Sequence, residues 1–152
     1  MTKKVHGLTQ IDEINTMIHE DLSGKIIGVF YSVYNALGHG FLEKVYENAM
    51  MIELRKIGLH AEQQKKASVY YDSQVVGEYY ADIVVNGVVI LELKVADAIV
   101  AEHEAQLINY LKATEIELGL LFNFGPKPEF IRRILTNDRK DISHGQRSDV
   151  KG

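Results

Sequence analysis

The spacing of apolar residues divides the chain into a helical beginning and an extended middle. Apolar residues recur at helical spacing over residues 24–37 and again over about 41–57, whereas residues 61–95 form runs with the period of strands. We therefore expect two helices followed by three strands. Ser23 is placed to cap the first helix, and Gly58 is placed to end the second.

Turn residues separate the expected strands, and the helical period returns after them. The expected elements are strands over 61–71, 75–85 and 88–95, a helix over 101–113, and strands over 118–124 and 130–135. The order of helices, three-strand meander, helix and two strands predicts an α/β (α+β-like) fold. In such a fold a mixed sheet has helices packed on it.

The length and composition are typical of one folded domain. The chain has 152 residues, of which 46% are hydrophobic and 25% charged. We expect a single domain with a core over about 24–135. Residues 1–20, with a weak helical pattern, and the polar residues 136–152 are expected to be peripheral or flexible. No apolar run approaches the roughly 20 residues of a membrane span, so we expect no membrane segment.

The charge balance is mildly acidic, with 17 Lys and Arg against 21 Asp and Glu, a net charge of −4. This balance argues against a protein that holds nucleic acid by bulk electrostatics. It does not exclude a nuclease, because the carboxylates of a nuclease bind a cation before they meet phosphate. The chain has no cysteine, which excludes disulfides and thiolate sites and suits a reducing compartment, so we expect a cytoplasmic protein.

Three polar residues of the expected meander are candidates for chemistry. Glu92 and Lys94 share one face of the third strand, where burial is costly without a partner or an ion. Asp82 lies in the preceding strand. Two carboxylates on adjacent strands suit Mg²⁺ or Mn²⁺, and a nearby lysine can orient an attacking water or stabilise charge on a phosphate. A Glu-x-Lys pair by itself is more often a surface ion pair.

The turn between the second and third strands decides whether the two carboxylates meet. A two-residue turn at 86–87 places Asp82 opposite Leu91 and puts Glu92 on the other face of the sheet. A bulged three-residue turn at 85–87 puts Asp82 and Glu92 on the same side. We expect the bulged turn if the two residues share a metal ion.

The helix over about 41–57 carries two acids near its start. Its expected buried arc consists of Leu42, Val45, Tyr46, Ala49, Ile52 and Ile57. Glu43 falls at the edge of this arc and Glu47 further toward solvent. Glu43 is therefore a candidate third metal ligand, although an acid in a first helical turn is also favoured by the helix dipole alone.

The helix over 101–113 places His103, Gln106 and Tyr110 on one face. Gln106 and Tyr110 can hydrogen-bond a phosphate, a metal-bound water or the lysine of the site. The same residues can also form the polar flank of an amphipathic helix. His103 by itself is typical of a surface position, and we do not expect it to act as a general base.

Taken together, these segments resemble the GxxExxY proteins, a family of the PD-(D/E)XK nuclease superfamily, over about residues 24–135. The segments that carry the resemblance are 40–46 (GFLEKVY), 70–72 (YYD), 76–79 (VGEY), 81–82 (AD), 91–94 (LELK), 103–111 (HEAQLINYL) and 119–125 (GLLFNFG). The resemblance implies a restriction-endonuclease-like core with helices on both sides of the sheet and extra N-terminal helices. Ala81 stands where the superfamily motif has proline.

The resemblance also implies roles for the candidate residues. The implied catalytic set is Glu43, Asp82, Glu92, Lys94, Gln106 and Tyr110, the last two matching the Gln-x-x-x-Tyr motif of RecB-type nucleases. The implied ligands of Mg²⁺ or Mn²⁺ are Glu43, Asp82, Glu92 and the carbonyl of Leu93, with Glu47 as a substitute for Glu43. His103 is a further candidate for the site, without an implied role.

These observations lead to a metal-dependent nuclease as the first hypothesis, with DNA favoured over RNA. Lys44, Lys65 and Lys66 are candidates for contact with the nucleic-acid backbone, although each is also typical of a solvent-facing charge. The alternative is a catalytically silent module that binds nucleic acid or protein on the same fold. A homodimer is a further hypothesis, because the apolar helix over 24–37 carries more apolar surface than a small core needs.

Overall fold

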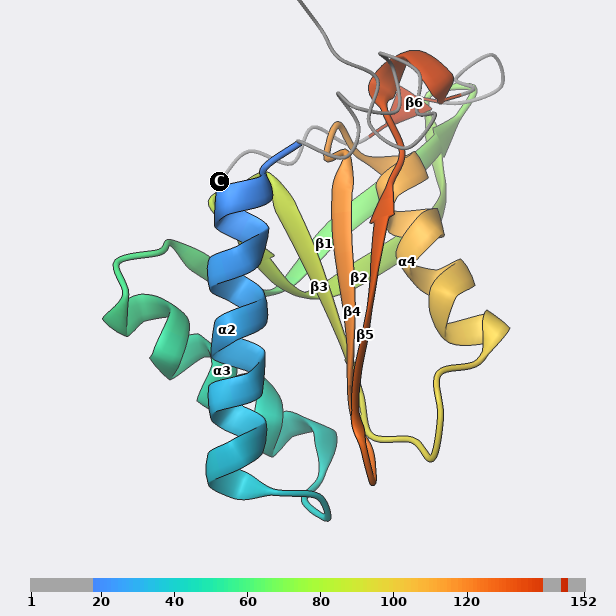
Figure 1. Cartoon of the computed structure of the whole chain (residues 1–152). Coiled ribbons are helices and arrows are strands. Elements are labelled where there is room, and N and C mark those ends of the chain that lie inside the picture. The colour runs from blue at the N-terminus through green and yellow to red at the C-terminus, as the bar shows by residue number, and fades with distance from the viewer. Residues whose placement is uncertain (1–17, 141–145, 148–152) are drawn as a thin grey trace, which may run out of the picture.

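The computed structural model describes residues 18–140 and 146–147 (Figure 1). The elements in chain order are α2 (Glu20–Leu37), α3 (Glu43–Lys56), β1 (Ala61–Tyr71), β2 (Gln74–Val85), β3 (Val89–Lys94), α4 (Ala101–Ala113), β4 (Leu118–Phe124), β5 (Pro128–Ile134), the 3₁₀ turn η1 (Asn137–Arg139) and β6 (Gln146–Arg147). The strands and α4 lie within about two residues of their expected positions. The short helix expected over residues 1–20 lies almost entirely outside the described residues.

The strands form one mixed sheet between two helical layers (Figure 1). The strand order is β5-β4-β3-β2-β1-β6, in which β3 and β4 run parallel and every other neighbouring pair runs antiparallel. The parallel pair needs a crossover connection, which α4 supplies. Helices α2 and α3 cover one face and α4 covers the other. The expected mixed sheet with helices on both sides is therefore confirmed.

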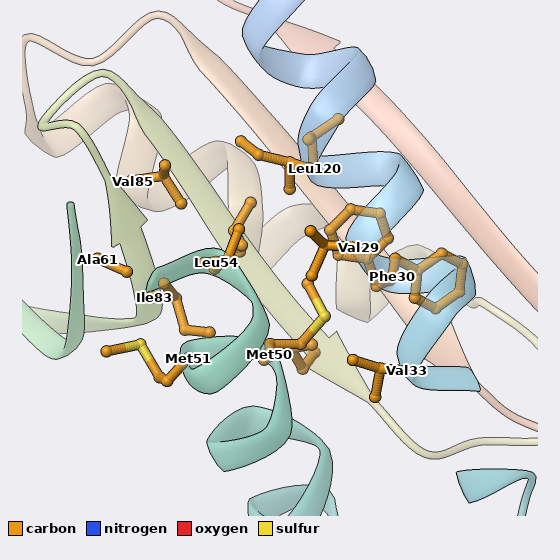
Figure 2. Close-up of a cluster of buried hydrophobic side chains, with 14 of the residues drawn as sticks. Val29, Phe30, Val33, Met50, Met51, Leu54, Ala61, Ile83, Val85 and Leu120 are labelled. Atoms are coloured by element: carbon orange, nitrogen blue, oxygen red, sulfur yellow. The ribbon is translucent and has the colours of Figure 1, made fainter. Parts of the chain in front are cut away.

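Two apolar cores hold the three layers together. In β4 the alternation is regular, with Leu120 and Phe122 facing α2 and α3 while Leu121 faces α4. Phe30 of α2 stacks on Phe122 with 4.5 Å between ring centroids. Figure 2 shows the core on the side of α2 and α3, in which methionine and leucine side chains of α3 lie among residues of α2, β2 and β4.

The start of α2 differs from its expected position. The helix begins at Glu20 rather than after Ser23, and Ser23 is buried inside it. The Ser23 hydroxyl donates to the Glu20 carbonyl (3.0 Å) instead of capping the helix. Apolar side chains of α2, among them Ile26, Phe30 and Val33, are buried against α3 and the sheet. The argument for a homodimer through this helix is therefore lost.

Helix α3 buries a different arc from the one expected. Leu42, Val45, Ile52 and Ile57 are exposed, whereas the buried residues are Tyr46, Glu47, Met50, Met51 and Leu54. The apolar pattern missed this arc because it treats every charged residue as solvent-facing. Glu47 is buried in this protein because polar groups of β1 satisfy its carboxylate, as described below.

The part of residues 136–152 that the structure describes is more ordered than expected. It includes η1, and β6 pairs with β1 at an edge of the sheet. Lys140 is buried, and its ammonium donates to the carbonyls of Thr114 and Ile116 (2.8 Å each). Within residues 18–140 and 146–147, no helix is long and apolar enough to cross a membrane.

Candidate active site

The loop between α2 and α3 fixes where Glu43 stands. Gly40 has φ 126°, which only glycine adopts readily. The buried hydroxyl of Tyr46 donates to the Gly38 carbonyl (2.6 Å) and accepts from the Phe41 N–H (3.2 Å). These bonds close the loop against the first turn of α3, so that Glu43 is the first residue of that helix. The spacing of Gly40, Glu43 and Tyr46 therefore has a structural reason.

The β2–β3 turn is neither of the two turns considered from the sequence. Val85 pairs with Val89, so the loop is residues 86–88. Asn86 takes a left-handed conformation (φ 52°), and its backbone N–H and side-chain oxygen both bond to the backbone of His60 (2.7 and 2.9 Å). This contact with the chain before β1 selects the turn, which is why local sequence could not.

The observed register brings the two carboxylates to the same level. Ile83 pairs with Leu91, and continuing the ladder by one residue places Asp82 opposite Glu92. The ladder stops there, and the Asp82 carboxylate accepts the Leu93 N–H instead (2.7 Å). The strands β2 and β3 therefore part at these residues, and the site lies at their separation.

Glu92 is the most unusual residue of the site. It is 1% exposed, and neither of its carboxylate oxygens has a well-formed hydrogen bond among the described residues. The backbone N–H and the carboxyl group of Asp82 lie close enough to influence its pKa, but at poor hydrogen-bond geometry. Burial raises its pKa to about 9, the neighbouring Asp82 adds to this shift, and Lys94 opposes it. A buried carboxyl group without donors destabilises the fold unless a ligand satisfies it.

Asp82 and Glu43 complete the acidic side of the site. Burial raises the pKa of Asp82, and the hydrogen bond from the Leu93 N–H opposes the shift. Glu43 is exposed at the start of α3, yet partial loss of hydration raises its pKa. Lys94 lowers the pKa of Glu43, whereas Asp82 raises it. Glu43 of α3 is therefore close enough to sense charged groups from β2 and β3.

Two polar residues of α4, Gln106 and Tyr110, form hydrogen bonds with different partners. Lys94 Nζ donates to Gln106 Oε1 (2.9 Å), so Gln106 holds the ammonium group. Tyr110 is buried and donates to the Lys65 carbonyl of β1 (3.0 Å). Burial raises the pKa of Tyr110, and Glu92 adds to this shift.

The remaining candidates have other partners. His103 Nδ1 accepts the Val100 N–H (3.2 Å), which caps the start of α4. The three lysines considered for backbone contact each pair with a glutamate: Lys44 with Glu47, Lys65 with Glu62 and Lys66 with Glu78. Each of these four residues therefore has a partner other than Asp82 and Glu92.

Glu47 is buried in α3 rather than turned toward solvent as expected. It is 3% exposed. Its donors are Lys44 Nζ (2.7 Å), Gln63 Nε2 (2.6 Å) and Gln64 Nε2 (2.8 Å). Both of its oxygens are engaged, so Glu47 connects α3 to β1 and is a poor candidate for binding a cation.

Gln63 and Gln64 were missed from the sequence. Gln64 has φ 51° inside a strand, a conformation that costs an L-residue on the order of 1–3 kcal/mol. It turns two consecutive side chains toward Glu47, although neighbours in a strand normally point to opposite faces. The only sequence signal is a pair of adjacent glutamines, and nothing in a glutamine residue indicates a positive φ.

The site combines the donors that a divalent cation prefers with one carboxylate that lacks a partner. Within the described residues, no three acidic or histidine side chains are arranged to hold a metal ion. The unsatisfied oxygens of Glu92 and the adjacent carboxylate of Asp82 nevertheless fit a hard cation in their chemistry. Lys94 beside them fits a substrate that carries negative charge.

Comparison with known families places the chain in a nuclease superfamily. The family described as the PD-(D/E)XK nuclease superfamily matches residues 20–134, a range that includes every candidate residue from Glu43 to Tyr110. Comparisons with curated proteins and with solved structures give no significant match.

Proposed function

The chain belongs to the PD-(D/E)XK nuclease superfamily, and we propose that it is a nuclease that depends on a divalent metal ion and hydrolyses phosphodiester bonds. The loop that joins Gly40, Glu43 and Tyr46 supports a place among the GxxExxY proteins of that superfamily. DNA is the substrate that we would test first, with RNA in parallel.

One observation carries the proposal. Glu92 is buried without a well-formed hydrogen bond to either carboxylate oxygen, at the point where β2 and β3 part, opposite Asp82 and two residues from Lys94. A structural carboxylate in such a position would be expected to have donors, as Glu47 does. A carboxylate that binds a cation needs its oxygens free.

We propose a set of ligands for the cation from the residues at this point of the sheet. Asp82, Glu92 and the carbonyl of Leu93 would hold the cation, Mg²⁺ or Mn²⁺, with Glu43 completing the set from α3. Glu43 is preferred to Glu47 because donors occupy both oxygens of Glu47. When bound, such a cation supplies a water of lowered pKa and positive charge beside the phosphate.

The chain's own residues would orient and stabilise the reaction. Gln106 holds the Lys94 ammonium at the site, where it would orient the attacking water and stabilise the negative charge that develops on the phosphate oxygens. Tyr110 ties α4 to β1 through the Lys65 carbonyl, which keeps Gln106 in position above the sheet.

A cleavage assay tests the proposal. The wild type, Glu92→Gln and Lys94→Ala would be incubated with labelled single- and double-stranded DNA and RNA, with Mg²⁺, Mn²⁺ or EDTA. Lys56→Ala is the matched control, because Lys56 is an exposed lysine paired with Glu53 at the far end of α3. We expect metal-dependent cleavage by the wild type and the control only.

Two outcomes would contradict the proposal. Equal cleavage by all four proteins would identify a contaminating nuclease. Binding of nucleic acid without cleavage under any condition would assign the chain to the alternative, a module that binds without cutting.

A further inference from the structure

The hairpin of β1 and β2 changes face at Gln64. Ala61 packs toward α2 and α3, whereas Ala67, six residues further along the same strand, packs toward α4. Residues separated by an even number in a regular strand share a face, so the strand must reverse between them. Gln64 (φ 51°) lies in that interval, and the β1–β2 register places it opposite Asp82. The reversal therefore falls at the candidate active site.

The side chain of Gln64 connects two acidic residues. Its Nε2 donates to Glu47 Oε1 (2.8 Å) and to Asp82 Oδ1 (3.4 Å). Carboxylate oxygens accept hydrogen bonds, so the amide must turn its nitrogen toward both and uses both of its hydrogens. The other oxygen of Asp82 accepts the Leu93 N–H (2.7 Å). The Asp82 carboxylate is thus held from both sides, and each oxygen keeps a second lone pair.

We propose that Gln64 is a positioning residue for the metal site, in which its left-handed backbone aims the amide at Asp82 and fixes the oxygens that Asp82 offers to the cation. The inference rests on the proposed metal-dependent function. Partners of this kind orient the ligating group, and losing one weakens metal binding even though the ligand itself remains. Glu47 anchors the amide from the opposite side and makes the strained conformation persist.

Two substitutions of Gln64 distinguish the effect of its side-chain amide from the effect of its left-handed backbone. Gln64→Gly removes the amide but adopts the same φ without strain, so the fold is retained. Asp72→Gly is the matched control, because Asp72 has the same φ of 51° at the turn between β1 and β2. Gln64→Asn is a second variant that tolerates a positive φ and carries an amide too short by one methylene to reach both carboxylates.

The test is calorimetric titration of the metal-free protein with Mn²⁺, with thermal unfolding recorded for every variant. We expect Gln64→Gly to raise the dissociation constant for Mn²⁺ about tenfold, and we expect Gln64→Asn to raise it as well. We expect Asp72→Gly to bind as the wild type does. Gln64→Gly also removes the donor to the buried Glu47 Oε1, so we expect its unfolding temperature to fall, whereas that of Asp72→Gly should change little. The titrations are therefore made at a temperature at which thermal unfolding shows every variant to be folded, so that the loss measured is one of metal binding.

A further variant, Glu92→Gln, distinguishes failure of this inference from failure of the proposed function. If the wild type binds Mn²⁺ and Glu92→Gln does not, while Gln64→Gly binds as the wild type does, the inference is wrong and the metal site stands. If Asp72→Gly weakens binding as much as Gln64→Gly, the effect is general and the inference is again wrong. If the wild type binds no Mn²⁺, or Glu92→Gln binds as well as the wild type, the metal site fails and the inference fails with it.

Discussion

Among the residues that the structure describes, two glutamates are almost completely buried, and their surroundings are opposite. Glu47, where α3 meets β1, has three donors, from Lys44, Gln63 and Gln64. Glu92, in β3, has no well-formed hydrogen bond to either oxygen among the described residues, although Asp82 lies close enough to influence its pKa. Burial raises the pKa of Glu92 to about 9. The same residue type is therefore a satisfied structural group in one region and an unsatisfied group in the other.

The hydrogen-bond donors around a buried carboxylate are therefore a criterion for assigning its role. A buried charge with a full set of donors contributes to the fold, and removing it leaves those donors without a partner. A buried carboxyl group without donors is a cost to the fold, which is retained where a ligand can satisfy it. On this argument we propose a structural role for Glu47 and a functional role for Glu92, and we expect substitutions at the two positions to have opposite consequences.

The largest expected effect is the loss of cleavage in Glu92→Gln. We expect its rate of phosphodiester cleavage to fall at least about 10²-fold, because the substitution removes a charge that would bind the cation. We expect its unfolding temperature to stay equal or to rise, since the replacement is neutral and of the same shape. Cleavage kinetics and thermal unfolding of the same preparation measure both. A stable, fully active Glu92→Gln would contradict the assignment.

The next effect is the loss of stability in Glu47→Ala. We expect the free energy of unfolding to fall by about 1–3 kcal/mol, because the amides of Gln63 and Gln64 lose a buried acceptor. Urea denaturation measures the change. Glu53→Ala is the control, since the exposed pair of Glu53 with Lys56 should contribute less than about 1 kcal/mol. Equal losses in the two variants would mean that the donors around Glu47 have no special weight.

A third effect is on the pH dependence of stability. The folded protein holds a proton on Glu92 up to a pKa of about 9, whereas the unfolded chain loses it near the ordinary value of 4.5. Between these pH values the folded state binds more protons, so the free energy of unfolding falls as pH rises. We expect this slope to be smaller in Glu92→Gln. Urea denaturation from pH 5 to 9 without metal measures it, and identical slopes would contradict the raised pKa.

The smallest expected effect is that of Lys44→Ala. Lys44 is one of three donors to Glu47, but its side chain is 59% exposed, so we expect a loss of less than about 1 kcal/mol. Urea denaturation beside Glu47→Ala measures the ratio. A loss as large as that of Glu47→Ala would show that the ion pair, rather than the glutamine amides, stabilises Glu47.

The elements of the fold could be predicted from sequence because each depends on local pattern. The bounds of β1, α4 and β4 follow from runs of apolar residues with a clear period, ended by turn residues. Asp82, Glu92 and Lys94 were identifiable as candidates because charged residues are unusual within apolar strands. What local pattern lacks is information on which distant groups meet.

The predictions of the β2–β3 turn, of the buried face of α3 and of an exposed Glu47 were wrong because these features depend on contacts between segments. The β2–β3 turn is selected by Asn86, which bonds to the backbone of His60 before β1. The burial of Glu47 depends on amides of β1 that reach it only because Gln64 adopts a positive φ. The turn, the buried face of α3 and the burial of Glu47 could therefore not be predicted for the same reason: each is decided by residues distant in the sequence.

The most direct test of the central claim, that Glu92 is kept without donors for a cation, is a crystal structure of the wild type with Mn²⁺, using the anomalous signal of the metal. We predict a peak between the carboxylates of Asp82 and Glu92, with the ion bonded to an oxygen of Glu92. A peak elsewhere, or no peak at Mn²⁺ concentrations that support cleavage, would contradict the claim.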